Sequence, residues 1–460
     1  MTKLLTMTRL TIGATVLALF ASAAARDADA CGDYMDEETR EIVETAIGGS
    51  LADAKDAIEI LRARGWEGVY ALSSYEHREK DEARKAHIRA MLDKVAGQKD
   101  AFASRLFWHT DLDEAKAAAA KRKLPILSLR LLGRLDEDLS CANSRYFRTV
   151  LYADERVHHY LRQHYVLHWK TVRPVPVVTV DFGDGRKVCR TVTGNSAHLV
   201  LDQDGRPLDV LPGLYSAKAF RAGLEQAHAV ARGLEGIHPS ERAHVLARVH
   251  RNAGSRLDEA FAKDLKALGD RNAEGMLKRV LARRAAFEKR DTTEKPSARR
   301  AARDAVSKSI GETAMVEAIQ PEVLLVSADM DVHRYRRIAG LPRHADELGA
   351  GSLALMRAKT PKMSEEAFGR MLATFTQSVL HDSVRNEHLK HRTVHRWFEN
   401  ENVPTDADAL TERIYDELFY MPSDDAWLGL VPANAYSALD DGGFVREATP
   451  RRVSQANASR

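Results

Sequence analysis

Residues 124–129 read LPILSL and residues 141–147 read CANSRYF, and these two stretches decide the fold. The first is a short apolar run with the length of a buried strand. The second begins at Cys141, after a polar loop, and continues into a segment whose apolar residues have helical spacing. We therefore predict that Cys141 stands at the N-terminus of a helix that follows a strand. Strand, loop and helix in this order indicate an α/β unit.

The chain around these stretches extends the alternation of helix and strand. The predicted elements are, in order, a helix over 112–122, the strand above, a helix over 145–163, strands over 165–169 and 198–202, a turn at 203–205 and a helix over 216–234. Strand, helix, strand, hairpin and final helix form the order of an α/β sandwich. We place this unit at residues 106–234.

Helical segments flank the unit on both sides, so the expected fold class is α/β plus α. At 460 residues the chain is too long for one ordinary core. An N-terminal region, 26–105, and a C-terminal region, 235–446, both carry apolar residues at helical spacing. Residues 447–460 are polar, and we predict a disordered tail there.

The first 25 residues have the organisation of a secretory signal peptide. Lys3 and Arg9 give a positively charged start, 10–20 is a short apolar run, and 21–25 supply small residues at cleavage spacing. The run is too short to span a bilayer. We therefore predict that residues 1–25 are removed and that the protein is periplasmic or secreted.

Composition excludes several classes of partner. The chain has 69 basic and 66 acidic residues and a net charge of +3, so no overall charge favours nucleic acid. No later stretch approaches about 18 uninterrupted apolar residues, so no transmembrane span is expected in the mature chain. Only three cysteines occur, and an odd number leaves at least one thiol without a partner in the chain.

The predicted position of Cys141 has a chemical meaning. Free backbone N–H groups and the helix dipole at a helix N-terminus stabilise a thiolate and make it more reactive. A second cysteine three residues later would lie one turn away and could resolve a mixed disulfide. That position holds Ser144, whose hydroxyl can donate a hydrogen bond to the thiolate but cannot form the disulfide.

Motifs on both sides of Cys141 support a family resemblance. Before it stand Glu114-Ala115-Lys116 and Lys123-Leu124-Pro125-Ile126-Leu127, and after it Gly194-Asn195-Ser196 and Asp204-Gly205-Arg206-Pro207. With these motifs, residues 106–234 resemble the thioredoxin superfamily, nearest to the bacterial branch with Cys-His-Trp-Cys and Gly-Trp-Pro. The resemblance implies a thioredoxin-like α/β sandwich.

Two departures from the family pattern bear on activity. Ser144 falls on the second cysteine of the pair, and Ser196 falls on the cis-proline beside which substrate strands pair in thioredoxins. Because cis peptide bonds are rare without proline, we expect a trans bond at Ser196. The active site implied by the resemblance is therefore degenerate. It is compatible with a binding or structural domain, or with a monothiol oxidoreductase that acts through Cys141.

Cys189 lies seven positions before Ser196 and has three interpretations. It could form a structural disulfide with Cys141, act as a distant resolving thiol, or be a lone cysteine in a hairpin. The spacing alone does not choose among them, because a disulfide needs the two Cα atoms within about 4.4–6.8 Å.

A second candidate site lies in the C-terminal region, where His381, His388, His391 and His395 cluster. His391 and His395 are four residues apart, so on a helix they share a face and could bind a metal. Surface histidines of a polar helix explain the same pattern. The His-Glu-x-x-His order of zinc hydrolases is missing, as are a haem-attachment motif and a phosphate-binding loop, so no cofactor is expected.

These features predict a binding or scaffolding protein of the cell envelope with a protein partner. The first alternative is a thiol–disulfide oxidoreductase acting through Cys141 with the support of Ser144. The second alternative is a metal-binding module that uses the histidines between His381 and His395. The sequence carries no signal for the oligomeric state.

Overall fold

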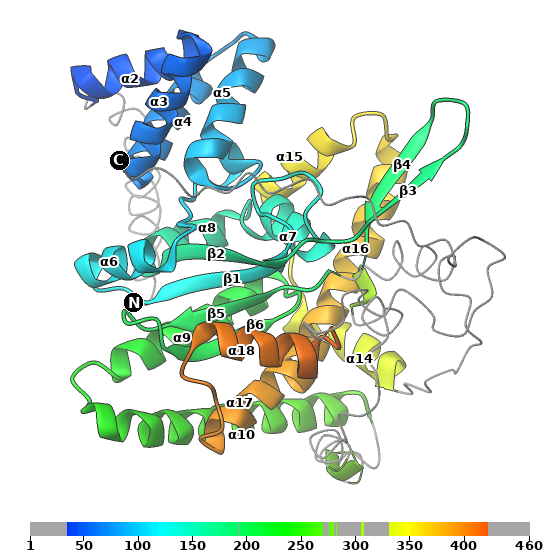
Figure 1. Ribbon diagram of the computed structural model, residues 1–460. Helices are drawn as coiled ribbons and strands as arrows, with labels where there is room; N and C mark the ends of the chain where they lie inside the picture. The colour runs from blue at the N-terminus through cyan, green and yellow to red at the C-terminus, as the bar shows by residue number, and fades with distance from the viewer. Residues whose placement is uncertain are drawn as a thin grey trace, which may run out of the picture.

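The computed structural model describes residues 35–192, 194–269 and 331–421, together with positions 275, 277–279, 282 and 305–307. The expected signal peptide at 1–25, Cys31 and the expected tail at 447–460 lie outside the described residues. The described chain is a mixed α/β structure in which a small mixed sheet is flanked in sequence by helical regions, as predicted (Figure 1).

The central sheet has four strands in the order β2-β1-β5-β6. The strands are β1 (Ile126–Leu132), β2 (Val166–Arg173), β5 (Ala197–Leu201) and β6 (Pro207–Pro212). β1 and β2 are parallel, with Ile126 opposite Val166, whereas β5 runs antiparallel to both β1 and β6. The sheet thus joins a strand–helix–strand crossover to an antiparallel hairpin.

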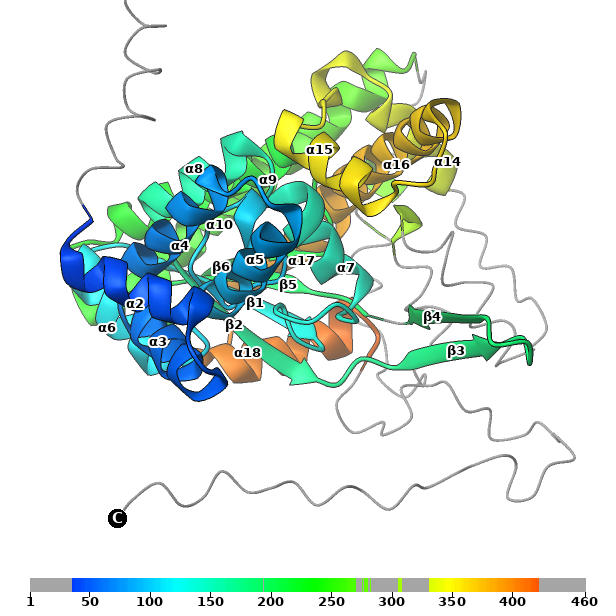
Figure 2. The same cartoon turned by 90° about the horizontal axis from the view of Figure 1, so that it is seen from above.

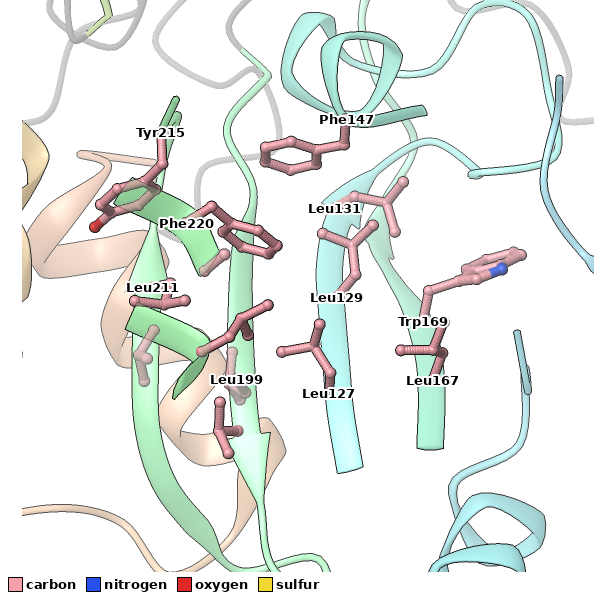
Figure 3. Close-up of a cluster of buried hydrophobic side chains, with 14 of the residues drawn as sticks. Leu127, Leu129, Leu131, Phe147, Leu167, Trp169, Leu199, Leu211, Tyr215 and Phe220 are labelled. Atoms are coloured by element: carbon pink, nitrogen blue, oxygen red, sulfur yellow. The ribbon is translucent and has the colours of Figure 1, made fainter. Parts of the chain in front are cut away.

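β1 is buried along its whole length, which explains why its sequence is almost continuously apolar. Leu127, Leu129 and Leu131 lie on one face of the sheet with Phe147 and Phe220 (Figure 3). The alternating residues of β1 point to the opposite face, because side chains along a strand alternate. Both faces of the sheet are therefore covered.

Helices of the same unit cover the first face. They are α7 (Ala142–Tyr146), η3 (Phe147–Leu151), α8 (Glu155–His164) and α9 (Ala217–Gly233). α8 and α9 lie against each other on this face (Figure 2). The remaining helix of the unit, α6 (Leu112–Arg122), packs against β1 and β2 from the other side (Figure 2). The single helix expected over 145–163 is divided, because the Asp154 side chain accepts a hydrogen bond from the backbone of Arg156 and starts α8 as a new helix.

The N-terminal helices form a separate hydrophobic cluster. They are α2 (Glu37–Gly48), α3 (Leu51–Ala63), α4 (Trp66–Arg78) and α5 (Glu82–Ala96), followed by the short η2 (Ala101–Ala103). Val43, Leu61, Leu72 and Leu92 are fully buried in this cluster. Arg62 connects it to the α/β unit, because its guanidinium donates hydrogen bonds to the carbonyls of residues 95 and 108.

The C-terminal helices pack around the α/β unit, and some of them share its core. They are α10 (Pro239–Ala267), α14 (Asp331–Ala339), η4 (Pro342–His344), α15 (Ala350–Lys359), α16 (Glu365–Arg385), η5 (Asn386–His391), α17 (Arg392–Glu399), α18 (Ala407–Arg413) and η6 (Ile414–Leu418). Trp397, Leu410, Ile414 and Phe419 belong to the same buried cluster as the strands. α18 lies on the face of the sheet opposite α8 and α9 (Figures 1 and 2).

A two-stranded hairpin projects from this body (Figures 1 and 2). It consists of β3 (Val177–Asp181) and β4 (Lys187–Thr191), which pair only with each other among the described strands. Of the helices that the structure describes, none combines the length and the apolar character needed to cross a membrane.

Candidate functional site

Cys141 lies where the sequence predicts, directly before the first turn of α7 and after the loop that follows β1. Its backbone has the extended conformation of a helix-capping residue, and its N–H donates a hydrogen bond to the carbonyl of Leu132 at 3.2 Å. The side chain is fully buried, with an exposed fraction of 0%. The thiol is therefore part of the core, although its place at the helix start resembles that of a reactive cysteine.

Two serine hydroxyls contact the Cys141 sulfur. The thiol donates to Ser144 Oγ at 3.4 Å, and Ser196 Oγ lies 3.1 Å from the same Sγ. Ser144 donates its own hydroxyl hydrogen to the Cys141 carbonyl at 2.9 Å. With the thiol neutral, Ser144 is thus the acceptor of the thiol proton and directs its own proton to the backbone.

The loop 194–196 closes against Cys141. A Cβ atom on Gly194 would lie 2.1 Å from the Cys141 Cβ, so only glycine permits this approach. Ser196 follows in the same loop, is fully buried, and accepts a backbone hydrogen bond from Gly213 at 2.9 Å. The described residues contain no cis peptide bond, in agreement with the trans bond expected at Ser196.

The C-terminal segment covers this loop from the other side. Tyr415, in η6, donates its hydroxyl to the carbonyl of Asn195 at 2.7 Å. Burial, together with the nearby Cys141, raises the pKa of Tyr415 well above its ordinary value, so the hydroxyl stays protonated and remains a donor. The backbone next to Ser196 is thus occupied by the chain itself. Sequence reasoning missed Tyr415, because nothing local marks it.

An ion pair between a buried arginine and a half-exposed aspartate holds α18 against the sheet. Arg130 of β1 is 1% exposed, and its Nη1 lies 2.6 Å from Asp408 Oδ1 at the start of α18. Lys170 of β2 pairs with the other oxygen of the same carboxylate. Burial lowers the pKa of Arg130, and the Asp408 carboxylate opposes that effect. The C-terminal segment is therefore fixed to the two parallel strands, β1 and β2, by charge as well as by apolar contact.

Cys189 lies away from this site. It is exposed on β4, and its sulfur is 3.5 Å from Thr179 Oγ1 across the hairpin. Cys141 and Cys189 are both free, so the disulfide considered between them is absent from the described structure. The hairpin that carries Cys189 projects into solvent, whereas Cys141 faces the core. The interpretation as a lone hairpin cysteine agrees with this placement.

The four C-terminal histidines are buried, so the interpretation as surface histidines is wrong. His381, His388, His391 and His395 are 1–5% exposed. His391 and His395 do share a face, with ring centroids 4.2 Å apart. His381 and His388 lie elsewhere. His388 packs on Phe261, and burial lowers the pKa of His381 to about 4, so that ring is neutral at neutral pH.

Two residues that the sequence did not indicate complete the histidine site. His250 of α10 approaches His395, with the two Nδ1 atoms 2.7 Å apart, and His391 Nε2 lies 3.1 Å from Asp209 Oδ1 of β6. One ligand atom each of Asp209, His250 and His395 lies within 4.8 Å of the others, so these three could hold a metal. The local signal for Asp209 is an acidic residue inside the apolar strand PLDVLP.

Burial and neighbouring side chains both shift the pKa values of the residues at this site. Burial alone would raise the pKa of Asp209, but His391, His395 and His250 hold it well below its usual value. Burial lowers the pKa of His395, and His391 lowers it further. The site therefore combines an ionised carboxylate with a neutral imidazole, which is the ligand state that a metal ion requires.

Comparisons with protein-family models, with curated proteins and with solved structures gave no match to this chain. Functional inference therefore depends on two local geometries. One is the buried thiol between Ser144 and Ser196, and the other is the cluster formed by Asp209, His250, His391 and His395.

Proposed function

We propose that this chain is an exported binding protein of the cell envelope, built on a thioredoxin-like unit whose thiol no longer exchanges disulfides. The observation that carries the proposal is the complete burial of Cys141. Thiol–disulfide exchange needs a thiolate that can reach a disulfide sulfur. A cysteine enclosed in the core cannot be reached by a disulfide, and its apolar surroundings disfavour the thiolate that the step requires.

The family assignment within this proposal is supported by topology and by the site. A parallel strand–helix–strand crossover is joined to an antiparallel hairpin and a closing helix, in the sheet order β2-β1-β5-β6. Cys141 begins the helix after β1, and Ser196 from the loop before β5 contacts its sulfur. These are the relative positions that the resemblance implies for the active cysteine and the cis-proline.

The covering segment supports binding in preference to redox catalysis. In thioredoxins a substrate strand pairs with the backbone beside the cis-proline. Here Tyr415 donates a hydrogen bond to the carbonyl of Asn195, next to Ser196. The ion pair between Arg130 and Asp408 fixes α18, the helix directly before the segment that carries Tyr415. A protein substrate therefore has no free backbone to pair with next to Cys141.

The hairpin β3–β4 is the surface that we assign to the partner. Val177 and Phe182 are 47% and 55% exposed, and each strand has an outer edge that no described strand covers. Exposed apolar side chains beside an open strand edge fit an extended segment of another polypeptide, which would add a strand to the hairpin. The partner class is thus a protein with an extended apolar segment.

Two measurements test the proposal. Oxidised glutathione should form a mixed disulfide with the exposed Cys189 of the native mature chain and not with Cys141, as located by peptide mass spectrometry. A photoreactive residue in place of Phe182 should form a discrete adduct in the cell envelope, whereas one in place of Leu51, which is 93% exposed on α3, should not. Equal modification of Cys141 and Cys189 would favour the oxidoreductase alternative. Identical crosslinking from both positions would contradict the assignment of the hairpin.

A further inference from the structure

The cluster between β6, α10 and α17 has the composition of a metal centre. Asp209, His250 and His395 each offer a ligand atom, and these atoms lie within 4.8 Å of one another. Nitrogen and oxygen ligands stand about 2.1 Å from zinc, which puts them about 3.4 Å apart around a tetrahedral ion. The Nδ1 atoms of His250 and His395 are 2.7 Å apart, which is closer than two zinc ligands stand, whereas the full set of ligand atoms lies within 4.8 Å, which is wider. Small rotations of the side chains would therefore suffice.

The surroundings of His250 fix the nitrogen that would bind. Its Nε2 lies 2.9 Å from the carbonyl oxygen of Leu208, which can only accept a hydrogen bond. The proton of the neutral ring is therefore on Nε2, and the Nδ1 lone pair accepts a hydrogen bond from His395 Nδ1 at 2.7 Å. A metal ion would take the place of that shared proton, which would move to Nε2 of His395. A histidine whose other nitrogen donates to a backbone carbonyl is the usual arrangement of a metal ligand.

Asp209 is held in the same way. The backbone N–H of Val210 donates to Asp209 Oδ1 at 2.8 Å, and His391 Nε2 lies 3.1 and 3.3 Å from the two carboxylate oxygens. Hydrogen bonds of this kind orient a ligating carboxylate. The burial of Asp209, at 3% exposed, also makes a compensating positive charge favourable.

A surface pocket lies next to the cluster. Leu208 and Phe398 line a surface pocket of about 430 Å³. Both contact His250, because Leu208 accepts its hydrogen bond and the Phe398 ring stacks on it with centroids 4.1 Å apart. An ion in the pocket is thus separated from the ligands by one layer of side chains.

We propose that Asp209, His250 and His395 bind a divalent transition-metal ion, with zinc as the first candidate. Imidazole and carboxylate groups are ligands that zinc accepts. Among divalent first-row metals, copper and zinc bind to such nitrogen and oxygen sites more tightly than manganese or iron. His391 is a positioning residue that acts through Asp209. The ion would connect the sheet to two C-terminal helices, because Asp209 lies on β6, His250 on α10 and His395 on α17.

Metal content and metal affinity test this site. The full mature chain, free of any histidine tag, should contain about one zinc ion and should regain it after chelation, as measured by elemental analysis and by competition with a chromophoric chelator. His395→Asn and His250→Asn should abolish binding. His391→Gln should weaken it by about 10–100-fold, as removal of a hydrogen-bonding partner of a ligand does. His381→Asn is the matched control, because His381 is buried nearby in sequence and lies outside the cluster, and it should bind as the wild type does.

Cobalt binding to the wild-type chain keeps the proposal falsifiable if a ligand variant fails to fold. Co²⁺ added to the chelated protein should give the visible d–d absorption of a tetrahedral site, and stoichiometric Zn²⁺ should displace it. Zinc should also raise the thermal midpoint of the wild type and of His381→Asn. The absence of both metal and cobalt absorption would overturn the proposal, as would unchanged zinc affinity in folded His395→Asn.

Discussion

Replacing Gly194 by alanine tests whether the loop 194–196 truly closes over Cys141. The added Cβ would lie 2.1 Å from the Cβ of Cys141 and 3.1 Å from its Cα. Carbon atoms in contact are at least about 3.5 Å apart, so the loop or the start of α7 must move by about 1.4 Å. Insertion of a methyl group into a packed core costs about 1–3 kcal/mol, and we expect the upper end of that range because both atoms are attached directly to backbone.

Urea unfolding followed by circular dichroism measures this effect, and second substitutions identify its cause. Cys141→Gly removes the opposing Cβ and should recover most of the loss in the double variant with Gly194→Ala. Cys141→Ser keeps the Cβ and should recover none of it, although it also removes the sulfur. A loss below about 0.5 kcal/mol for Gly194→Ala would place it among ordinary surface substitutions and refute the close approach of the loop.

Three further substitutions or conditions give separate tests. Tyr415→Phe should lower the free energy of unfolding by about 1–2 kcal/mol, because the buried carbonyl of Asn195 loses its donor; an unchanged urea midpoint would contradict this contact. Asp408→Ala should destabilise the chain by about 2–3 kcal/mol by leaving Arg130 buried without its carboxylate, and Arg130→Met combined with Asp408→Ala should restore most of that loss in the same assay. Burial lowers the pKa of His198 to about 3, so the unfolded chain takes up this proton first and stability is lost as the pH falls from about 6.5 toward 3, by up to about 1.4 kcal/mol per pH unit. His198→Gln should reduce the slope of unfolding free energy against pH over that window, and an unaltered slope would exclude His198 as its source.

Much of the fold could be predicted from the sequence because its signals are local. The apolar run 126–129 and the turn after 202 mark strands without any tertiary information. The helix start at Cys141 follows from the order of strand, loop and helical spacing. A hairpin around Cys189 is one of the interpretations that the sequence allows, but the bounds of β3 and β4 could not be predicted, because most residues of both strands are exposed and present no apolar face.

The sites could be predicted only in part, because their remaining members come from distant segments. Tyr415 contacts a loop 220 residues earlier in the chain, and His395 meets His250 across 145 residues. His391 and His395 were found by their spacing, whereas Asp209 is marked only by its position within an apolar strand. A single sequence gives no sign of which helix covers which strand, and the burial of Cys141 depends on that information.

The reactivity of Cys141 in the native chain tests the central claim most directly. Isotope-coded alkylation, quenched at successive times and resolved by peptide mass spectrometry, compares its rate with that of exposed Cys189 in the same molecule. We predict that Cys189 is alkylated at the rate of an unfolded peptide, and that Cys141 reacts at that rate only after denaturation. Alkylation of both at similar rates in the folded protein would contradict the account.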